Sequence, residues 1–307
     1  MGTISYVDPF TGLETTRELE PATLEVRPSP NLDLTYFMQR DIFGDDPLTE
    51  EVEPMVPSQF SLLINNKGNG DATNVKMVTQ QPKIVENEKG LLVEFEILSS
   101  QLNGGDKVLA LGEAVTTDFG TIPAHSQTYA QWWMQCSLTG HFTSYDVNAT
   151  HVTSYGNPDL SLLDSVTIHE LIHSIKVPAN NGTNQKLVGF VCNDESDAND
   201  TPDKIYFSNA TTAPVDIAFR SNIGSLNKNK ATLTAEPKQT GWTYGYVRDP
   251  SAGKRKIIGI RRLSDNAEID LDNFWQTDRT LRDGADPLYE NLIHYVDSIN
   301  ENGDPMS

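Results

Sequence analysis

Hydrophobic and polar residues alternate along most of this chain in short runs rather than with a helical period. The runs are four to nine residues long, rich in β-branched and aromatic side chains, and separated by clusters of Gly, Pro, Asn and Asp. This pattern is typical of antiparallel strands with one buried and one hydrated face. The first half contains LDLTYFM (32–38), FSLLI (60–64), NVKMV (74–78), LLVEFEIL (91–98) and TYAQWWMQC (128–136). The second half contains KLVGFVC (186–192), KIYFS (204–208), PVDIAF (214–219), WTYGYV (242–247), KIIGIRRL (256–263) and NLIHYVDSI (291–299).

The spacing of these runs predicts an all-β protein of two immunoglobulin-like antiparallel β-sandwiches in tandem. A polar, turn-forming stretch, VPANNGTNQ (177–185), marks the boundary between them. We therefore expect an N-terminal linker at 1–29, a first sandwich at 30–180 and a second β-rich domain at 181–307.

Composition narrows the range of partners. The 43 acidic and 23 basic residues give a net charge of −20, and such a chain is repelled by phosphate backbones. No run of about 18 apolar residues is present, so we expect no insertion into a membrane. Cys136 and Cys192 are the only cysteines; they could form one disulfide, and they leave the cellular compartment open.

Part of the first half resembles a known family. INNKGNGDATNVKMV (64–78) has a strand ending in Asn66, a turn through two glycines, and a following strand that starts near Ala72. DFGTIPAHSQTYAQWWM (118–134) then has a turn leading into a strand with Trp132. In the turn, glycines would supply positive φ and Asn side chains would bond the backbone. Over about residues 30–150 this resembles the CARDB and NEW3 type of immunoglobulin-like module, which implies an interaction or spacer module of large secreted or cell-surface bacterial proteins, without catalytic residues.

The segment VTIHELIHSI (166–175) contains a complete H-E-x-x-H motif, the core signature of zinc metallopeptidases. In a helix, His169 and His173 would share one face and bind a single zinc ion, with Glu170 beside them as general base. A short helix at 160–175 is compatible with the flanking prolines. A strand is equally compatible, and it would point Glu170 away from the histidines and remove this geometry.

A zinc peptidase also needs a third ligand. Glu195 lies 22 residues after His173, at a spacing that resembles the distal glutamate of thermolysin-like peptidases. Its surroundings, NDESDANDTPD (193–203), read as a loop rather than as the second helix that this ligand requires. We therefore favour structural histidines and no catalytic residue, with the zinc site His169, His173 and Glu195 as the alternative.

The same acidic loop is a candidate calcium site. Carboxylate oxygens are the ligands that Ca²⁺ prefers, but the spacing of an EF-hand is absent, so a hydrated acidic turn is the competing interpretation. The candidate ligands are Asp194, Asp197, Asp200 and Asp203.

Two further patterns suggest surface binding. Trp132–Trp133 and the WTYGYV run (242–247) could stack on a sugar ring, although one residue of each alternating pair is normally core. A basic run from Arg248 to Arg262 surrounds a DPSAGK turn and is typical of a charged hairpin or a docking patch for an acidic neighbour.

These observations favour a non-catalytic interaction or spacer segment, of adhesion type, within a larger extracellular or cell-surface bacterial protein. Its expected partners are neighbouring domains of a longer chain and a protein or carbohydrate ligand, without nucleic acid and without a required cofactor. A zinc metallopeptidase that uses His169, Glu170 and His173 is the alternative.

Overall fold

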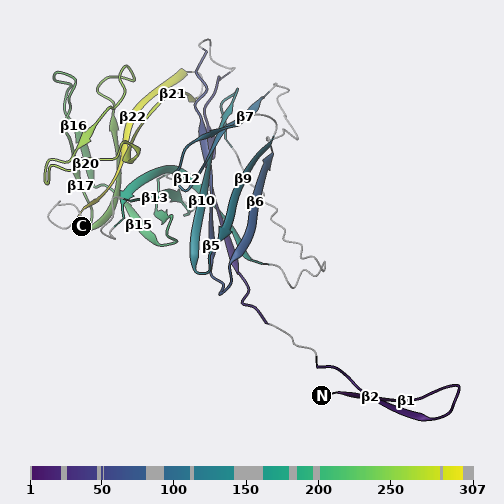
Figure 1. The fold of residues 1–307 in the computed structure, drawn as a ribbon. Coiled ribbons are helices and arrows are strands. Elements are labelled where there is room, and N and C mark those ends of the chain that lie inside the picture. Colours follow the sequence, from purple (N-terminus) through teal and green to yellow (C-terminus); the bar gives the residue numbers. More distant parts are fainter. Residues whose placement is uncertain are drawn as a thin grey trace.

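The fold is almost entirely β (Figure 1). The computed structural model describes residues 2–21, 26–46, 50, 52–80, 93–110, 114–141, 162–179, 185–195, 201–283 and 286–299. Within these ranges the regular structure consists of strands and one short 3-10 turn, η2 (Leu271–Asn273). The expected all-β class is therefore confirmed.

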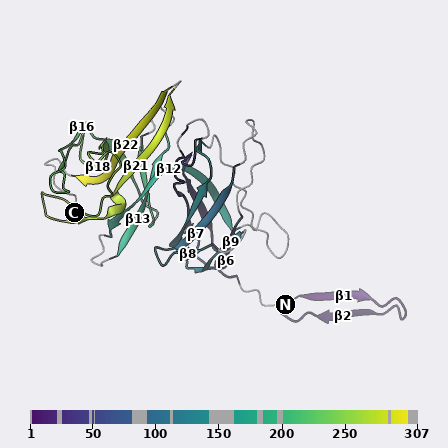
Figure 2. The ribbon, with the colours of Figure 1, turned by 90° about the horizontal axis from the view of Figure 1, so that it is seen from above.

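The strands before residue 150 form a hairpin and the first half of the molecule. The hairpin is β1 (Thr3–Val7) and β2 (Glu14–Glu18). The first half comprises β3 (Leu32–Met38), β4 (Asp41–Ile42), β5 (Ser58–Asn66), β6 (Ala72–Gln80), β7 (Phe95–Leu102), β8 (Val108–Leu109), β9 (Ala114–Ile122), β10 (Ser126–Cys136) and β11 (Gly140–His141). Residues 1–29, expected to be a linker, thus contain a β-hairpin that stands apart from the rest in two perpendicular views (Figures 1 and 2).

The second half begins with the longest strand, β12 (Leu163–Pro178). The remaining strands are β13 (Lys186–Asn193), β14 (Lys204–Phe207), β15 (Thr212–Ile217), β16 (Arg220–Ile223), β17 (Leu233–Glu236), β18 (Gly241–Arg248), β19 (Ile260–Arg261), β20 (Glu268–Ile269), β21 (Phe274–Asp283) and β22 (Asp286–Ile299).

One sheet runs through both halves. Its strand order is β21-β22-β18-β15-β14-β13-β12-β3-β5-β10-β7-β8, so the strand β12 joins the halves. Residues Leu163–Glu170 of β12 pair in parallel with β3, and Glu170–Pro178 pair antiparallel with β13. The pairing of β15 with β18 is also parallel, and the other pairings within this sheet are antiparallel. The expected boundary at 177–185 lies at the connection between two paired strands, β12 and β13.

Each half has its own apolar core on one face of this sheet. In the first half the β6–β9 sheet covers β5, β7 and β10, and Leu62, Trp132 and Ile122 are among the buried residues. In the second half the core contains Ile175, Val191, Ile205 and Val296, each fully buried. Register places the core residues of both halves on the same face of the sheet.

A third core lies on the opposite face, where the halves meet. It contains Phe37, Leu63 and Tyr129 from the first half and Leu171, Val188, Phe190 and Cys192 from β12 and β13. The ring of Phe190 stacks on Phe37 at a centroid distance of 4.3 Å and meets Tyr129 edge-on at 6.1 Å. We call this group the junction core. Because its members come from both halves, separating the halves would expose it to water.

The turn after β5 is held by Asn66, whose side chain is fully buried. Its Oδ1 accepts from the backbone N–H groups of Asn31 and Gly68, and its Nδ2 donates to the carbonyl groups of Gly70, Ile122 and Pro123. The expected role of asparagine is therefore present, but the role given to the glycines was wrong. Gly68 and Gly70 have no positive φ; a Cβ atom on either would collide with the backbone of residues 28–31. Close backbone approach is the reason for glycine here.

The short helix considered at 160–175 is not present among the described residues of that range, since residues 163–175 lie in β12. Val166, Thr167, Ile168, Ile172 and Ile175 are β-branched, and such side chains favour an extended backbone. Pairing on both sides of β12 adds backbone hydrogen bonds that reinforce this local preference.

Cys136 and Cys192 are both buried and are not bonded to each other. Among the residues that the structure describes, no helix is long and apolar enough to cross a membrane.

Candidate functional site

The H-E-x-x-H motif lies in the middle of β12, where this strand changes partners. A β-bulge interrupts the pairing with β13 between Leu171 and His173, so Ile172 is the extra residue. Side chains alternate along a regular strand, and one extra residue reverses the alternation beyond it. His169 and Leu171 therefore face the junction core, whereas His173 and Ile175 face the core of the second half. The two histidines point to opposite faces of the sheet.

His169 belongs to a polar cluster at the edge of the junction core. Its Nδ1 lies 2.8 Å from Asp194 Oδ1, and Tyr206 Oη donates to Asp194 Oδ2 at 2.5 Å. The ring of His169 also packs 4.3 Å from the ring of Tyr206 and 5.8 Å from that of Phe37. These contacts fix the imidazole from three sides.

The charges in this cluster favour an ionised Asp194. Burial raises the pKa of Asp194, but the hydrogen bonds from His169 and Tyr206 outweigh that effect and the pKa lies below its usual value. Burial and the bond to Asp194 raise the pKa of Tyr206, which keeps this phenol protonated as the donor. A histidine–carboxylate pair of this kind can orient an imidazole for proton transfer, but catalysis also requires a nucleophile or a bound water.

Cys192, a candidate nucleophile on the neighbouring strand β13, is unsuited to the task. Cys192 pairs with Leu171 across the strands and is fully buried. Burial, and then the negative charges of Asp194 and Asp203, raise the pKa of this thiol well above its usual value. The thiol is therefore protonated at neutral pH, and a protonated buried cysteine is inert.

Glu170, the candidate general base, lies on the sheet face opposite His169. Its carboxylate forms an ion pair with Arg40, with Nη1 and Oε2 3.3 Å apart, and its side chain is 9% exposed. The neighbouring Gln39 donates to the carbonyl of Ile172, in the bulge, at 3.2 Å. The two residues that follow β3 thus anchor the motif: Gln39 binds its backbone, and Arg40 binds the carboxylate of Glu170.

His173 is part of a stack of aromatic rings. It lies 4.1 Å from the indole of Trp275, and Trp275 in turn stacks on His294 at 5.2 Å. Burial lowers the pKa of His173 to about 4, and the negative charge of Asp272 only partly offsets this. Both ring nitrogens of His294 are engaged, Nδ1 with Tyr244 and Nε2 with Thr277, each at 2.9 Å. This stack was not anticipated from the sequence, because its members lie up to 121 positions apart.

The structure does not bring the proposed zinc ligands together. His169 and His173 are separated by the sheet, and Glu195 lies in the turn after β13, where its backbone N–H donates to Asp203 at 2.6 Å. Within the described ranges, no group of three or more His, Cys, Asp or Glu side chains is placed to hold a metal ion.

Two of the proposed calcium ligands have structural roles. Asp203 Oδ2 accepts from the backbone N–H groups of Asp194 and Glu195, which closes the acidic turn. Asp194 binds His169 and Tyr206, as described above. Asp197 and Asp200 lie outside the described residues.

The aromatic residues proposed for sugar binding are partly core. Trp132 is 1% exposed and stacks on Phe60, whereas Trp133 lies beneath the ammonium group of Lys107 at 3.5 Å. In the second half Tyr244 is buried and Tyr246 is 47% exposed.

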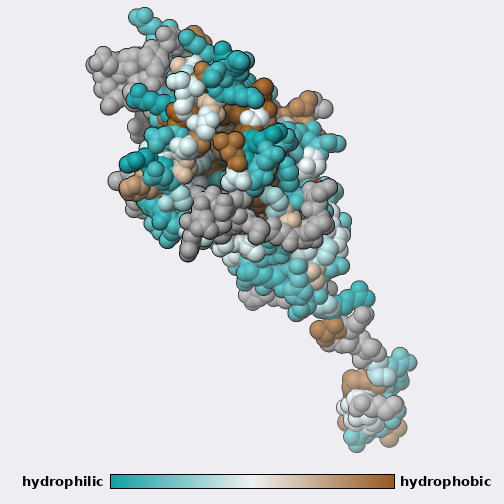
Figure 3. Space-filling view, turned by 90° about the vertical axis from the view of Figure 1, so that its left-hand side faces the viewer, coloured by the Kyte–Doolittle hydropathy of each residue, from teal (hydrophilic) through white to brown (hydrophobic). Residues whose placement is uncertain are grey.

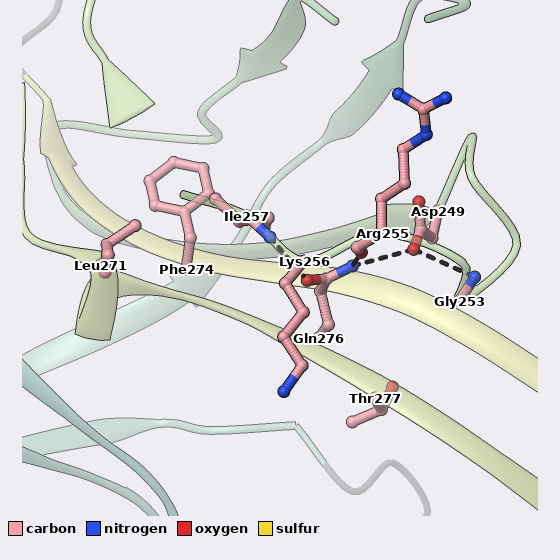
Figure 4. Close-up of a pocket in the computed structure, with 9 residues that line it drawn as sticks. All are labelled: Asp249, Gly253, Arg255, Lys256, Ile257, Leu271, Phe274, Gln276 and Thr277. Atoms are coloured by element: carbon pink, nitrogen blue, oxygen red, sulfur yellow. Dashed lines mark hydrogen bonds between the residues drawn. The ribbon is translucent and has the colours of Figure 1, made fainter. Parts of the chain in front are cut away.

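The basic run forms one wall of an open cavity of about 360 Å³ that the sequence did not reveal (Figure 4). The loop after β18 is ordered by Asp249, which accepts from the backbone of Ser251 and Gly253 and from Gln276 Nε2. Gln276 also accepts from the N–H of Ile257 and so ties this loop to β21. The cavity lies between the loop and the strand, with Ile257, Leu271 and Phe274 on its apolar side.

Searches of protein-family models, curated proteins and solved structures found no match to this chain.

Proposed function

We propose that this chain is a non-catalytic interaction and spacer segment of a larger secreted or cell-surface bacterial protein, built of immunoglobulin-like modules. The observation that carries the proposal is the junction core. A segment that holds neighbouring modules at a fixed separation needs a stiff connection between them, and here the connection is a shared strand with buried apolar side chains on both sides of the join.

The arrangement of the candidate catalytic groups supports the same proposal. His169, Glu170 and His173 each have a structural partner: Asp194, Arg40 and Trp275 respectively. The zinc metallopeptidase alternative would need both histidines on one face of one element. The resemblance of residues 30–150 to CARDB-type modules adds to the support, and the acidic, polar surface suits a segment that stays hydrated between partners.

The proposal is tested by asking whether the halves unfold together. Phe190 belongs to β13 but packs against Phe37 and Tyr129 of the first half. Replacing it by alanine should lower the free energy of unfolding by about 3–5 kcal/mol, because a large buried ring is lost. In hydrogen exchange at equilibrium, we expect faster exchange in β5 and β10 as well as in β13.

Phe207→Ala is the matched control, since Phe207 is also nearly buried but packs within the core of the second half. It should accelerate exchange in β13–β15 and leave β5 and β10 largely protected. If Phe190→Ala gives the same local pattern as Phe207→Ala, the halves are independent and the proposal of a stiff spacer is wrong.

A further inference from the structure

Positive charge is concentrated in one part of this acidic protein. Residues 220–262 contain ten of the 23 Lys and Arg residues but only two of the 43 Asp and Glu residues. That segment carries a net charge of +8, whereas the rest of the chain carries −28. A segregation of this size creates opposite local potentials on different parts of one molecule.

The centre of the positive region is formed by two adjoining loops. Lys228 and Lys230 flank Asn229, whose Oδ1 accepts from Arg255, and Lys254 and Lys256 flank that arginine. All five cationic residues are exposed. Arg262 is different, because it pairs with both Asp265 and Asp297. Within the described ranges, no carboxylate lies at ion-pair distance from the five cations, which we call the basic patch.

The basic patch adjoins the cavity beneath residues 253–257. Arg255 and Lys256 line the cavity, and in Figure 4 their side chains extend to opposite sides of the loop. Ile257, Leu271 and Phe274 provide its apolar lining, and Ile258 next to it is 91% exposed. A cavity of about 360 Å³ with three apolar side chains on one wall and two cations beside it can accept an aromatic side chain that is flanked by carboxylates. The carboxylate in its lining, Asp249, is already bonded to Ser251, Gly253 and Gln276.

The N-terminal hairpin carries a group of that description. Phe10 at its tip is 95% exposed, with Asp8 two residues before it and Glu14 four residues after it along the chain. The tip is ordered, since Asp8 accepts from the N–H groups of Phe10 and Thr11 at 2.8 and 3.0 Å and Gly12 takes a positive φ. Residues 2–21 contain four acidic residues and one basic residue, a net charge of −3.

The hairpin also has a face that exposes three large apolar side chains beside Arg17 and Thr15. The pairing register places Ile4, Tyr6 and Leu19 on one face, with exposed fractions of 50%, 43% and 45%. A two-stranded hairpin is at best marginally stable in water without a partner for such a face. Figure 3 shows apolar surface both on this hairpin and on the face of the second half that carries strands β16–β20.

We propose that two copies of this chain associate head to tail, with Phe10 of one hairpin seated in the cavity beneath residues 253–257 of the next copy. The hairpin and the basic patch lie at opposite ends of the molecule (Figure 1), so one copy presents both surfaces to different neighbours. At physiological salt the screening length is about 8 Å, so the overall repulsion between the two acidic molecules is weak. Whether two copies associate is then determined by the interactions within the contact itself. A contact of this type is heterologous, and it can repeat from copy to copy in an open chain or in a closed ring.

Sedimentation of the full chain tests the proposal. A hairpin tip gives an interface at the small end of the range for specific contacts, so we examine roughly 1–200 µM protein at about 0.15 M salt. The average mass should rise with concentration above the 34.0 kDa of one chain. Phe10→Ala should remove this rise, whereas Phe219→Ala, an equally simple change at a phenylalanine that is 69% exposed away from the cavity, should not. Likewise Lys256→Glu should remove it and Lys238→Glu should leave it.

Mixing the two defective variants provides the decisive measurement. Phe10→Ala retains the cavity and Lys256→Glu retains the hairpin, so an equimolar mixture should form a dimer and nothing larger, although each variant alone remains a monomer. A wild-type chain that stays monomeric throughout the concentration range overturns the proposal. So does a mixture that remains monomeric, or a control variant that is as defective as its counterpart.

Discussion

His169 and His173 show how much the role of a side chain depends on its immediate neighbours. Both belong to a motif that suggests one shared metal ion. In the structure, however, His169 contacts the carboxylate of Asp194 and the ring of Tyr206, whereas His173 stacks on the indole of Trp275. A buried ring without a carboxylate partner at hydrogen-bond distance favours the neutral form.

The first prediction concerns the pH dependence of stability. Because the pKa of His173 falls from 6.5 to about 4 on folding, the unfolded chain binds more protons between these values. The contribution of this residue is therefore complete above pH 6.5 and is lost as the pH falls toward 4. His173→Gln should remove that part of the pH dependence, on the order of 1–2 kcal/mol after allowance for partial exposure, in denaturant unfolding from pH 7 to 4.

His125→Gln is the control, since His125 is exposed and contacts Asn69 at the surface. It should leave the pH profile unchanged. An identical profile for the wild-type protein and His173→Gln would show that His173 is not buried in the neutral form.

The second prediction concerns zinc. We expect protein purified without added metal to contain less than about 0.2 zinc per chain, against one for an occupied site with protein ligands. His169→Ala should lower the free energy of unfolding by about 1–3 kcal/mol, because Asp194 loses a hydrogen-bond partner and Tyr206 loses a ring contact. Elemental analysis and denaturant unfolding provide the two measurements. Stoichiometric zinc that is lost in His169→Ala and His173→Ala, with peptide cleavage that is lost in Glu170→Gln, would establish the metallopeptidase instead.

At the scale of elements, β12 is the decisive segment, because its two ends have different partners and its bulge exchanges the faces of its side chains. Its neighbour β13 has to lie close to it and to β14. Gly189 makes this possible: a Cβ atom there would lie 2.9 Å from Ile205 Cγ2 and 3.0 Å from Ile175 Cγ1.

The third prediction follows from this crowding. Gly189→Ala should lower the free energy of unfolding by about 1–3 kcal/mol, because an added methyl group forces packed side chains in the core of the second half to move. Gly140→Ala is the matched control, since a Cβ atom at Gly140 meets nothing within 4 Å. Thermal or denaturant unfolding compares the two. Equal stability of both variants would mean that β12, β13 and β14 are less tightly packed than described.

The fourth prediction concerns the acidic turn between β13 and β14. Asp194 already binds His169 and Tyr206, and Asp203 already accepts hydrogen bonds from two backbone N–H groups. Binding of Ca²⁺ would have to displace these contacts. We expect millimolar Ca²⁺ to leave the Tm unchanged. A rise in Tm that disappears in Asp197→Ala with Asp200→Ala would identify a calcium site by mass action on the folded state.

For the whole molecule, the fifth prediction is spectroscopic. A chain built of strands with one short 3-10 turn among its described residues should show a β-dominated far-UV circular dichroism spectrum, with helix below about 15%, against about 30–35% in average globular proteins. A helix-rich spectrum would contradict the fold and would reopen the helical interpretation of 166–175.

At this scale a single twelve-stranded sheet runs through both halves of the molecule, accompanied by smaller two-stranded sheets. Its cores alternate from face to face, with the junction core between them. Bending at β12 and β3 brings Phe190 onto Tyr129, although their strands are not neighbours in the sheet. Such a join would fix the orientation of the two halves, as the proposed spacer role requires.

The sequence by itself determined the class of the fold and most of its strands. Alternation with a period of two is a local property, so LDLTYFM, KLVGFVC and WTYGYV could be recognised as strands without knowledge of their partners. Asn66 could likewise be placed at the end of a strand beside a turn, because the bonds between its side chain and the next few residues are local.

Only the tertiary structure decided the state of the H-E-x-x-H segment and the nature of the sites. The apolar pattern of residues 166–175 fits a helix and a strand alike, and pairing with β3, more than a hundred residues earlier, reinforced the extended preference of their β-branched side chains. The bulge at Ile172, the stack of His173 on Trp275 and the cavity beneath residues 253–257 depend on contacts between distant segments. A pattern within one segment cannot specify these contacts, because the partner supplies half of each one.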